Sequence, residues 1–207
     1  MTRIIAGFAA SRRLAVPKSG TRPTSDRVRE AIFSALEAAD AIVGARVLDL
    51  YAGSGALGLE AASRGAAVVQ LVERDPRAAA IARTNAALVT AAAGRAPAPR
   101  IAVAAAAVQT WLGGPAGVTG ATVANATPGG GSAGDTGWDL VLIDPPYELT
   151  EAALTEALTA LVPLLAPDAR VVVERSARSP APTLPAGLES GRSRDYGETT
   201  VHWLSAA

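Results

Sequence analysis

Cysteine is missing from this chain of 207 residues, and histidine occurs once, at position 202. The lack of cysteine excludes disulfide bonds, thiolate nucleophiles and cysteine-ligated zinc, and it fits a reducing compartment. No run approaches the roughly 20 apolar residues of a membrane span, and the N-terminus lacks the long apolar core of a signal peptide. We therefore predict a cytoplasmic protein that needs no metal and no membrane.

The net charge of the chain is zero, but the charges are unevenly distributed. Residues 1–30 hold seven basic and two acidic side chains, a net charge of +5, so residues 31–207 carry −5. A basic arm on a mildly acidic body is an electrostatic footprint for phosphates, although a solvated arm would look the same. The predicted RNA-binding residues are Arg3, Arg12, Arg13, Lys18, Arg22, Arg29, Arg192 and Arg194.

From residue 46 onward, strand-like apolar runs alternate with helix-like segments. This alternation predicts an α/β fold with a mainly parallel sheet and helices on both faces. The C-terminal residues 188–194 and 200–204 predict a closing antiparallel pair. The expected parallel strands are residues 47–51, 68–73, 101–104, 140–144 and 171–174.

The N-terminal region has a different pattern. Residues 4–5 and 14–16 predict a β-hairpin, and Thr24 or Ser25 is expected to cap a following helix. We predict a basic hairpin-and-helix extension over residues 1–40 and a main domain over 41–207. Residues 113–137 contain nine glycines and one charge, a composition that predicts a flexible insertion loop.

A glycine-rich loop, Gly53-Ser54-Gly55-Ala56-Leu57-Gly58, follows the first expected parallel strand. Nicotinamide, flavin and S-adenosylmethionine enzymes all use such a loop, and a purely structural turn is the alternative. Asp49 would repel a pyrophosphate but suits a cationic ligand, while Glu73 is placed to accept ribose hydroxyls. We predict S-adenosylmethionine as cofactor, bound by Thr24, Arg27, Asp49, Tyr51, Ala52, Gly53, Ser54, Gly55, Glu73, Arg74, Ala106 and Asp144.

The motif Asp144-Pro145-Pro146-Tyr147 follows another apolar run. Two prolines stiffen the backbone and fix a carboxylate beside an aromatic ring. Asp144 and the Pro145 carbonyl can orient the exocyclic amine of a base for methyl transfer, and Tyr147 can stack on the extruded base. The predicted catalytic residues are Asp144, Pro145, Pro146 and Tyr147. A strand terminator with a surface tyrosine is the alternative.

Five segments in order resemble the bacterial 16S ribosomal RNA guanine-N2 methyltransferase family, the RsmD family: residues 3–7, 22–30, 49–60, 144–147 and 196–199. The resemblance implies a Rossmann-like, seven-stranded class I fold with an N-terminal hairpin. It also implies N2-methylguanine in small-subunit ribosomal RNA as product, with release of S-adenosylhomocysteine. The implied partner is an assembled or partly assembled 30S particle, and we expect a monomer.

Two other functions stay open at this point. The Asp-Pro-Pro-Tyr motif also occurs in DNA adenine and cytosine amino-methyltransferases, although no helix-turn-helix or zinc module is visible here. A non-catalytic RNA-binding assembly factor could keep the same fold. The choice of guanine over adenine depends on the resemblance alone.

Overall fold

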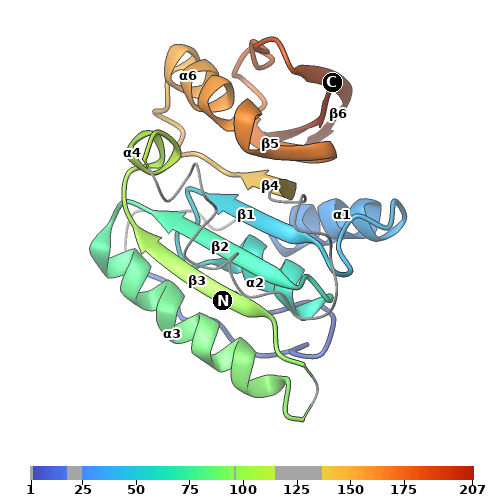
Figure 1. Ribbon diagram of the computed structural model, residues 1–207, viewed down its shortest axis with the longest axis vertical. Helices are drawn as coiled ribbons and strands as arrows, with labels where there is room; N and C mark the ends of the chain where they lie inside the picture. The colour runs from blue at the N-terminus through green and yellow to red at the C-terminus, as the bar shows by residue number, and fades with distance from the viewer. Residues whose placement is uncertain (1, 18–24, 96, 115–136) are drawn as a thin grey trace.

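The computed structural model describes residues 2–17, 25–95, 97–114 and 137–207. Within them, seven strands form one sheet in the order β3-β2-β1-β4-β5-β7-β6 (Figure 1). The strands β1 to β5 pair in parallel, whereas β6 and β7 are antiparallel and close one edge. The predicted α/β fold is therefore confirmed. The strands are β1 (Arg46–Leu50), β2 (Val68–Glu73), β3 (Arg100–Ala105), β4 (Trp138–Ile143), β5 (Leu165–Ser176), β6 (Leu188–Tyr196) and β7 (Thr199–Ala206).

Helices pack on both faces of the sheet, because the central strands present apolar side chains to both sides. On one face, Phe33, Leu59 and Ala82 join a core cluster that includes Val47 and Leu142. On the other face, a second cluster joins the remaining helices to the same strands. The helices are α1 (Asp26–Glu37), α2 (Ala56–Ser63) and α3 (Pro76–Ala92) on the first face, then α4 (Val108–Leu112), α6 (Glu151–Leu161) and the 3₁₀ turn η1 (Val162–Leu164) on the second.

Side-chain caps explain where three of these helices begin. The Ser25 hydroxyl accepts a hydrogen bond from Val28 N at 3.2 Å, which selects Ser25 from the two predicted caps. Asp75 accepts from Arg77 N at 2.7 Å and precedes a proline at the first helical position. Thr150 accepts from Ala153 N at 3.2 Å and caps the helix that begins at Glu151. Such caps satisfy amides that have no partner within the helix.

The N-terminal arm, residues 2–17, differs from its prediction. The chain reverses as expected, but the only ladder contact in the described arm is an isolated bridge between Arg3 and Arg13. Residues 4–5 and 14–16 do not form the two predicted strands, although backbone bonds from Ile4 N to Arg12 O and from Leu14 N to Thr2 O flank the bridge and join the two limbs. Ile4, Ala9 and Leu14 are buried in the same cluster as α1 and α2, so the arm packs as part of the main core.

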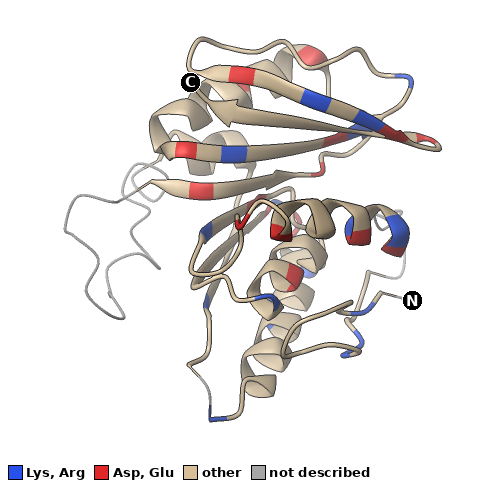
Figure 2. Cartoon of the chain, turned by 90° about the vertical axis from the view of Figure 1, so that its right-hand side faces the viewer, with Lys and Arg blue, Asp and Glu red and all other residues tan. Residues whose placement is uncertain are grey.

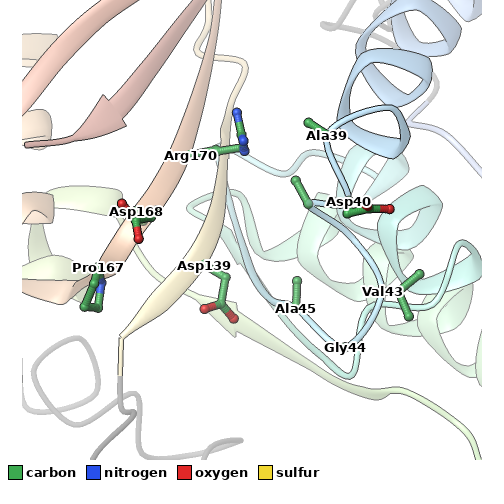
Figure 3. Close-up of a pocket in the computed structure, with 11 residues that line it drawn as sticks. Ala39, Asp40, Val43, Gly44, Ala45, Asp139, Pro167, Asp168 and Arg170 are labelled. Carbon is green, nitrogen blue, oxygen red and sulfur yellow. The ribbon is translucent and has the colours of Figure 1, made fainter.

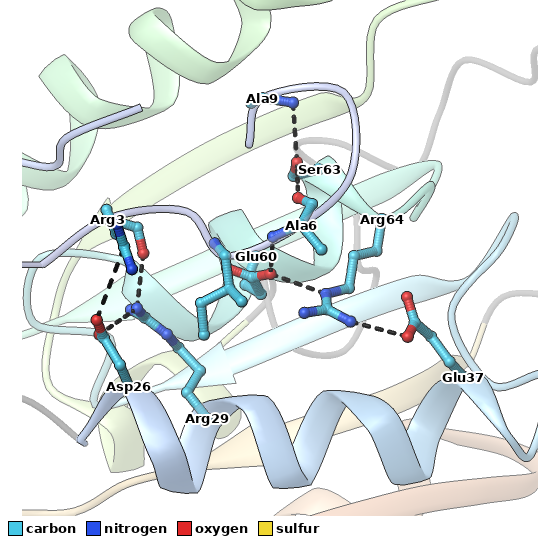
Figure 4. Close-up of polar contacts among 10 residues, drawn as sticks. Arg3, Ala6, Ala9, Asp26, Arg29, Glu37, Glu60, Ser63 and Arg64 are labelled. Carbon is cyan, nitrogen blue, oxygen red and sulfur yellow. Dashed lines mark hydrogen bonds and ion pairs between the residues drawn. The ribbon is translucent and has the colours of Figure 1, made fainter. Parts of the chain in front are cut away.

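Polar groups of α2 hold this arm in place (Figure 4). The buried Glu60 carboxylate accepts from Ile5 N at 2.7 Å and from Ala6 N at 3.0 Å. The Ser63 hydroxyl accepts from Ala9 N at 3.0 Å and donates to Ala6 O at 2.6 Å. Gly7 has a left-handed φ of +81°, and a Cβ at this position would overlap the Ser63 carbonyl. Only glycine therefore lets the arm pass so close to α2.

Three predictions about chain organisation have different outcomes. The division into residues 1–40 and 41–207 stays a prediction. Most of the predicted insertion loop at 113–137, namely residues 115–136, lies outside the described residues. Among the helices in the described part of the chain, each is too short or too polar to cross a bilayer.

Candidate active site

The carboxyl ends of β1, β2 and β4 bring the predicted acidic residues to one edge of the sheet. Parallel pairing places Leu50 opposite both Val72 and Ile143. The residues that follow these positions are Glu73 at the end of β2 and Asp144 just after β4. Both carboxylates lie close enough to Asp49 to raise its pKa. The structure thus brings together three side chains that lie up to 95 positions apart in the sequence.

The glycine loop between β1 and α2 is shaped by the same acidic residues. Gly53 and Gly55 both have left-handed backbones, with φ of +55° and +83°. Glu73 Oε2 accepts from Gly53 N at 2.9 Å, and its Oε1 accepts from Asp75 N at 2.7 Å. Each carboxylate oxygen has a second lone pair, so these bonds leave Glu73 able to accept ribose hydroxyls. Ribose binding by Glu73 stays a prediction. The structure adds a second role, because Glu73 also fixes the backbone of the glycine loop.

Asp49 is the buried acid of this edge. Its side chain is buried, and its Oδ2 accepts from Gly58 N at 2.8 Å. Its Oδ1 is also buried and has no hydrogen-bond partner in the described structure. Burial, with smaller contributions from Asp144 and Glu73, raises the pKa of Asp49 to about 8, against the opposing effect of the Gly58 hydrogen bond. A buried carboxyl with a spare acceptor is suited to a cationic ligand.

Gly58 fixes the distance between α2 and the sheet. A Cβ here would overlap the Leu71 side chain and lie 3.1 Å from Asp49 Cβ. We expect Gly58→Ala to push α2 outward and lower the free energy of unfolding by about 1–3 kcal/mol, with weaker cofactor binding. Thermal unfolding and calorimetric titration with S-adenosylmethionine would measure both effects.

Gly113→Ala is the matched control for this substitution. Gly113 caps α4 with ordinary helical dihedrals, and among the described residues its added Cβ would meet only Gln109 O, at 3.4 Å. The control should keep wild-type stability and affinity. An equally mild effect of Gly58→Ala would contradict the close packing inferred for α2.

Tyr51, which precedes the glycine loop, breaks the side-chain alternation of β1. Side chains alternate along β1, so that Leu48 and Leu50 face the second core cluster and Val47 faces the first. Residue 51 should then face the first cluster, yet Tyr51 packs against the second. Its φ of +63° provides the reason, because a left-handed backbone breaks the alternation. Burial raises the pKa of Tyr51, which keeps its hydroxyl neutral as a hydrogen-bond donor.

The Pro-Pro corner projects an aromatic ring into solvent. Pro145 is buried and Asp144 is half-buried, while the Tyr147 side chain is 61% exposed. A large aromatic ring that is exposed next to a rigid, half-buried carboxylate forms a platform on which a planar base can stack. The geometry is therefore compatible with the catalytic roles predicted for this motif.

Arg175, near the end of β5, holds the segment that follows the Pro-Pro corner. This residue was not identified from the sequence. Its side chain is 5% exposed, and its Nη1 and Nη2 both donate to Leu149 O at 3.2 Å. Leu149 N in turn donates to Pro146 O at 2.9 Å. Arg175 also lies 3.8 Å from the Glu151 carboxylate at the start of α6. Residues 144–149 are thus fixed by prolines at one end and by a guanidinium at the other.

The comparisons with known proteins agree with this geometry. The family model described as Conserved hypothetical protein 95 matches residues 2–109 and 122–205. The chain belongs to this family. The ribosomal RNA small subunit methyltransferase D of Escherichia coli (strain K12) is 58% identical over 74 residues, which span 35% of this chain and 36% of that protein. This match covers about a third of the relative's own length.

Solved structures extend the likeness over the whole chain. The Escherichia coli protein yhhF has a TM-score of 0.75 and 32% identity, covering 99% of this chain and 97% of that one. The magnesium protoporphyrin IX methyltransferase from Synechocystis PCC 6803, solved with bound SAM, has a TM-score of 0.58 and 13% identity over 91% and 87% of the two chains. This second likeness concerns the fold alone. The predicted resemblance to the RsmD family is confirmed by the family model and its relatives.

The remaining predicted cofactor residues occupy different positions in this family member. Ala106 N donates to Glu73 O at 3.0 Å, which ties the loop after β3 to the end of β2. Ser54 O accepts from the Asn85 side chain at 2.9 Å. Arg27 is exposed in the first turn of α1, and Thr24 lies outside the described residues. Ala52 and Arg74 flank the glycine loop and Glu73, so their contribution stays a prediction.

One of the predicted RNA-binding residues needs correction. The Arg29 side chain is fully buried, and its Nη2 donates to Arg3 O at 2.6 Å and to Asp26 Oδ1 at 2.8 Å (Figure 4). A guanidinium in this position cannot reach a phosphate without unpacking α1. The helical spacing explains the error, because Arg29 follows Val28 on the face that packs against the core.

Other predicted RNA-binding residues are accessible. Arg12 and Arg13 are exposed on the arm, and Arg3 lies 4.0 Å from Asp26. On β6, Arg192 stacks over Trp203 and Arg194 over Tyr196. Figure 2 shows basic segments on the arm, and basic and acidic segments interleaved along α1 and the outer strands. Lys18 and Arg22 lie outside the described residues.

A separate hollow of about 500 Å³ lies at the opposite, amino-terminal edge of the sheet (Figure 3). It is lined in part by Asp40, Asp139, Asp168 and Arg170. Asp139 Oδ2 already accepts from Arg46 N at 2.7 Å. The hollow is remote from the ends of β1, β2 and β4, so it does not belong to the candidate active site.

Proposed function

We propose that the protein transfers a methyl group from S-adenosylmethionine to the exocyclic N2 amine of a guanine in small-subunit ribosomal RNA. The observation that carries the proposal is the placement of the Asp144–Tyr147 corner at the same sheet edge as Asp49 and the glycine loop. The relatives' names support ribosomal RNA as the substrate class. The proposed setting is an assembled or partly assembled 30S particle in the cytoplasm, with the protein acting as a monomer.

The residues of this edge fit S-adenosylmethionine. When bound, this cofactor supplies a methyl group activated by a neighbouring sulfonium. Its positive groups match the buried Asp49, whose Oδ1 has a spare lone pair, and it has no phosphate that the acidic edge would repel. The left-handed Gly53 and Gly55 leave backbone that a ligand can approach closely. Asp49, Glu73 and the glycine loop would therefore hold it.

Asp144 and the Pro145 carbonyl orient the acceptor amine. The lone pair of an exocyclic amine is delocalised into its ring, which makes the nitrogen a poor nucleophile. Two hydrogen bonds accepted from the amine aim its lone pair and oppose the positive charge that develops on nitrogen. Holding the reacting groups in near-attack geometry supplies much of the remaining rate enhancement. This scheme requires no covalent enzyme nucleophile.

The test is to incubate the protein with small ribosomal subunits purified from a strain that lacks this activity. Digestion to nucleosides and mass spectrometry should reveal N2-methylguanosine and no other new methylated nucleoside. Parallel incubations with protein-free ribosomal RNA and with double-stranded DNA compare the substrate forms. Methylated adenine or cytosine in any sample would contradict the guanine assignment, and transfer to DNA alone would favour a DNA amino-methyltransferase.

Tyr147 provides a further test of the base platform. Base stacking on an aromatic ring contributes roughly 1–3 kcal/mol, so Tyr147→Ala should lower kcat/KM for ribosomal subunits about 10- to 100-fold. Tyr147→Phe keeps the ring and should remain within about threefold of wild type. Because the side chain is 61% exposed, thermal unfolding should not change in either variant. Equal losses in both variants would assign the effect to the hydroxyl and refute stacking.

A further inference from the structure

Asn85, in the middle of α3, connects two segments that no motif relates to each other. Its side chain is 1% exposed. Its Oδ1 accepts from Ala15 N at 2.9 Å, and its Nδ2 donates to Ala15 O at 2.9 Å. The same Nδ2 donates to Ser54 O at 2.9 Å. Both amide protons are therefore used, one on the N-terminal arm and one on the glycine loop.

The bonds to Ala15 form a reciprocal pair of the kind that a neighbouring β-strand would make. In the described arm, backbone pairing between its two limbs is limited to the Arg3–Arg13 bridge and its flanking bonds. Asn85 substitutes for the missing ladder at Ala15, near the end of the described arm. Asn85 is buried whereas Ala15 is exposed, so the cost of leaving a buried polar group unpaired falls on the Asn85 amide and favours this contact.

The bond to Ser54 acts on the glycine loop between its two left-handed glycines. Ser54 lies between Gly53 and Gly55, whose φ angles are both left-handed. On one side, the loop is held by Glu73 at Gly53 N and by Asp49 at Gly58 N. Asn85 provides the hold at Ser54 O. The orientation of the loop amides thus depends on a side chain that also holds the arm.

We propose that Asn85 is a positioning residue that couples the N-terminal arm to the cofactor loop. Occupation of the loop by the cofactor stabilises the arm at Ala15, and displacement of the arm weakens cofactor binding. The inference depends on the proposed function only for the cofactor and is independent of the nucleic-acid substrate. During catalysis, RNA that contacts the basic arm would therefore change how tightly the enzyme holds the methyl donor.

The first measurement uses wild-type protein and S-adenosylhomocysteine, without RNA. If the cofactor loop and arm are coupled, amide exchange at Ala15 slows as the ligand is added, by up to about tenfold at a free concentration ten times the Kd. Hydrogen exchange read by NMR resolves this single amide. Exchange at Ala15 that does not respond while the ligand is demonstrably bound would overturn the inference.

The second measurement uses Asn85→Asp, which keeps the shape of the side chain but removes both donated bonds. We expect the Kd for S-adenosylhomocysteine to rise at least about tenfold and the ligand-dependent protection of Ala15 to disappear. Thr84→Ala is the matched control, since Thr84 is exposed on the same helix and bonds only within it, to Ala80 O at 3.2 Å. It should bind the ligand as wild type does.

The outcomes separate a positioning role from a purely structural one. A variant with a lower Tm but an unchanged Kd, measured well below that Tm, would overturn the proposal. If Asn85→Asp does not fold, the exchange experiment on wild type still decides. Failure to methylate ribosomal subunits with the coupling intact would instead refute the proposed substrate and leave the inference standing.

Discussion

Asp144→Ala should reduce methyl transfer at least about 1000-fold while the protein still binds S-adenosylmethionine. Removing one preorganised acceptor that acts on charge developing in a transition state costs about 10²–10³-fold in rate. The loss here should reach the upper end or exceed it, because Asp144 both orients the amine and opposes its developing charge. Single-turnover transfer to small ribosomal subunits would measure the rate, and calorimetry the cofactor affinity.

Two further variants make this result specific. Asp144→Asn retains one acceptor oxygen without the charge, so its rate should fall between those of wild type and Asp144→Ala. Glu148→Ala removes an exposed carboxylate from the same loop and should keep the wild-type rate. If Asp144→Ala retained substantial activity, the amine-orienting role would be wrong. A parallel loss of cofactor binding would instead place Asp144 in the cofactor site.

Asp49→Asn should weaken S-adenosylmethionine binding by about 10- to 100-fold, the cost of a lost charge-assisted interaction. The amide oxygen can still accept from Gly58 N, but the amide protons then face the cationic ligand. Affinity should also depend on pH in the wild type. Because the pKa of Asp49 is about 8 without ligand, a proton must leave before the carboxylate can pair with the cation. Binding therefore strengthens as pH rises from 6 to 7.5.

The same substitution should have the opposite effect on the stability of the ligand-free protein. The pKa of Asp49 is raised from 3.8 to about 8 by folding, so the folded state holds more protons than the unfolded state between these values. Stability from this group is thus fully present below pH 3.8 and is lost as pH rises through 8. The asparagine side chain has no carboxyl group to protonate on folding, so this loss of stability does not occur in Asp49→Asn. We therefore expect the substitution to raise the Tm at pH 7.5 by a few degrees.

Calorimetric titration at several pH values tests the predicted loss of cofactor affinity, and thermal unfolding without ligand tests the predicted gain in stability. In Asp49→Asn, the steep pH dependence of affinity below pH 7.5 should disappear, and stability should become less sensitive to pH. A variant that binds S-adenosylmethionine as tightly as wild type would contradict the cation-binding role. A variant that is less stable at pH 7.5 would show that Asp49 is ionised in the ligand-free fold.

The sequence predicted elements whose signals are local. The apolar runs near Asp49, Glu73 and Asp144 placed the ends of these three strands to within one residue, and parallel strands align their carboxyl ends at one edge. The glycine loop was recognisable because left-handed backbone requires glycine at Gly53 and Gly55. Ser25 was one of two candidate caps, since short polar side chains satisfy the free amides of a helix start.

The residues that the sequence missed make contacts over long distances. Asn85 and Arg175 are ordinary polar residues of a helix and a strand until the fold places Ala15 and Leu149 beside them. Arg29 was assigned to a charged surface, yet its guanidinium is buried under the arm. Tyr51 was predicted to bind the cofactor, a role that stays a prediction, and only the fold showed that its left-handed backbone sets it against the second core cluster.

By itself, the sequence determined the order of strands and helices, the glycine turn and the chemistry available at each strand end. These features depend on dihedral preferences and on polar or apolar periodicity, which a short segment carries with it. Only the tertiary structure decided how the arm docks, which arginines reach solvent, and that Asp49 is buried with a raised pKa. Burial and hydrogen-bond partners depend on segments as far as 93 residues apart, as Arg46 and Asp139 are, and only packing brings such segments together.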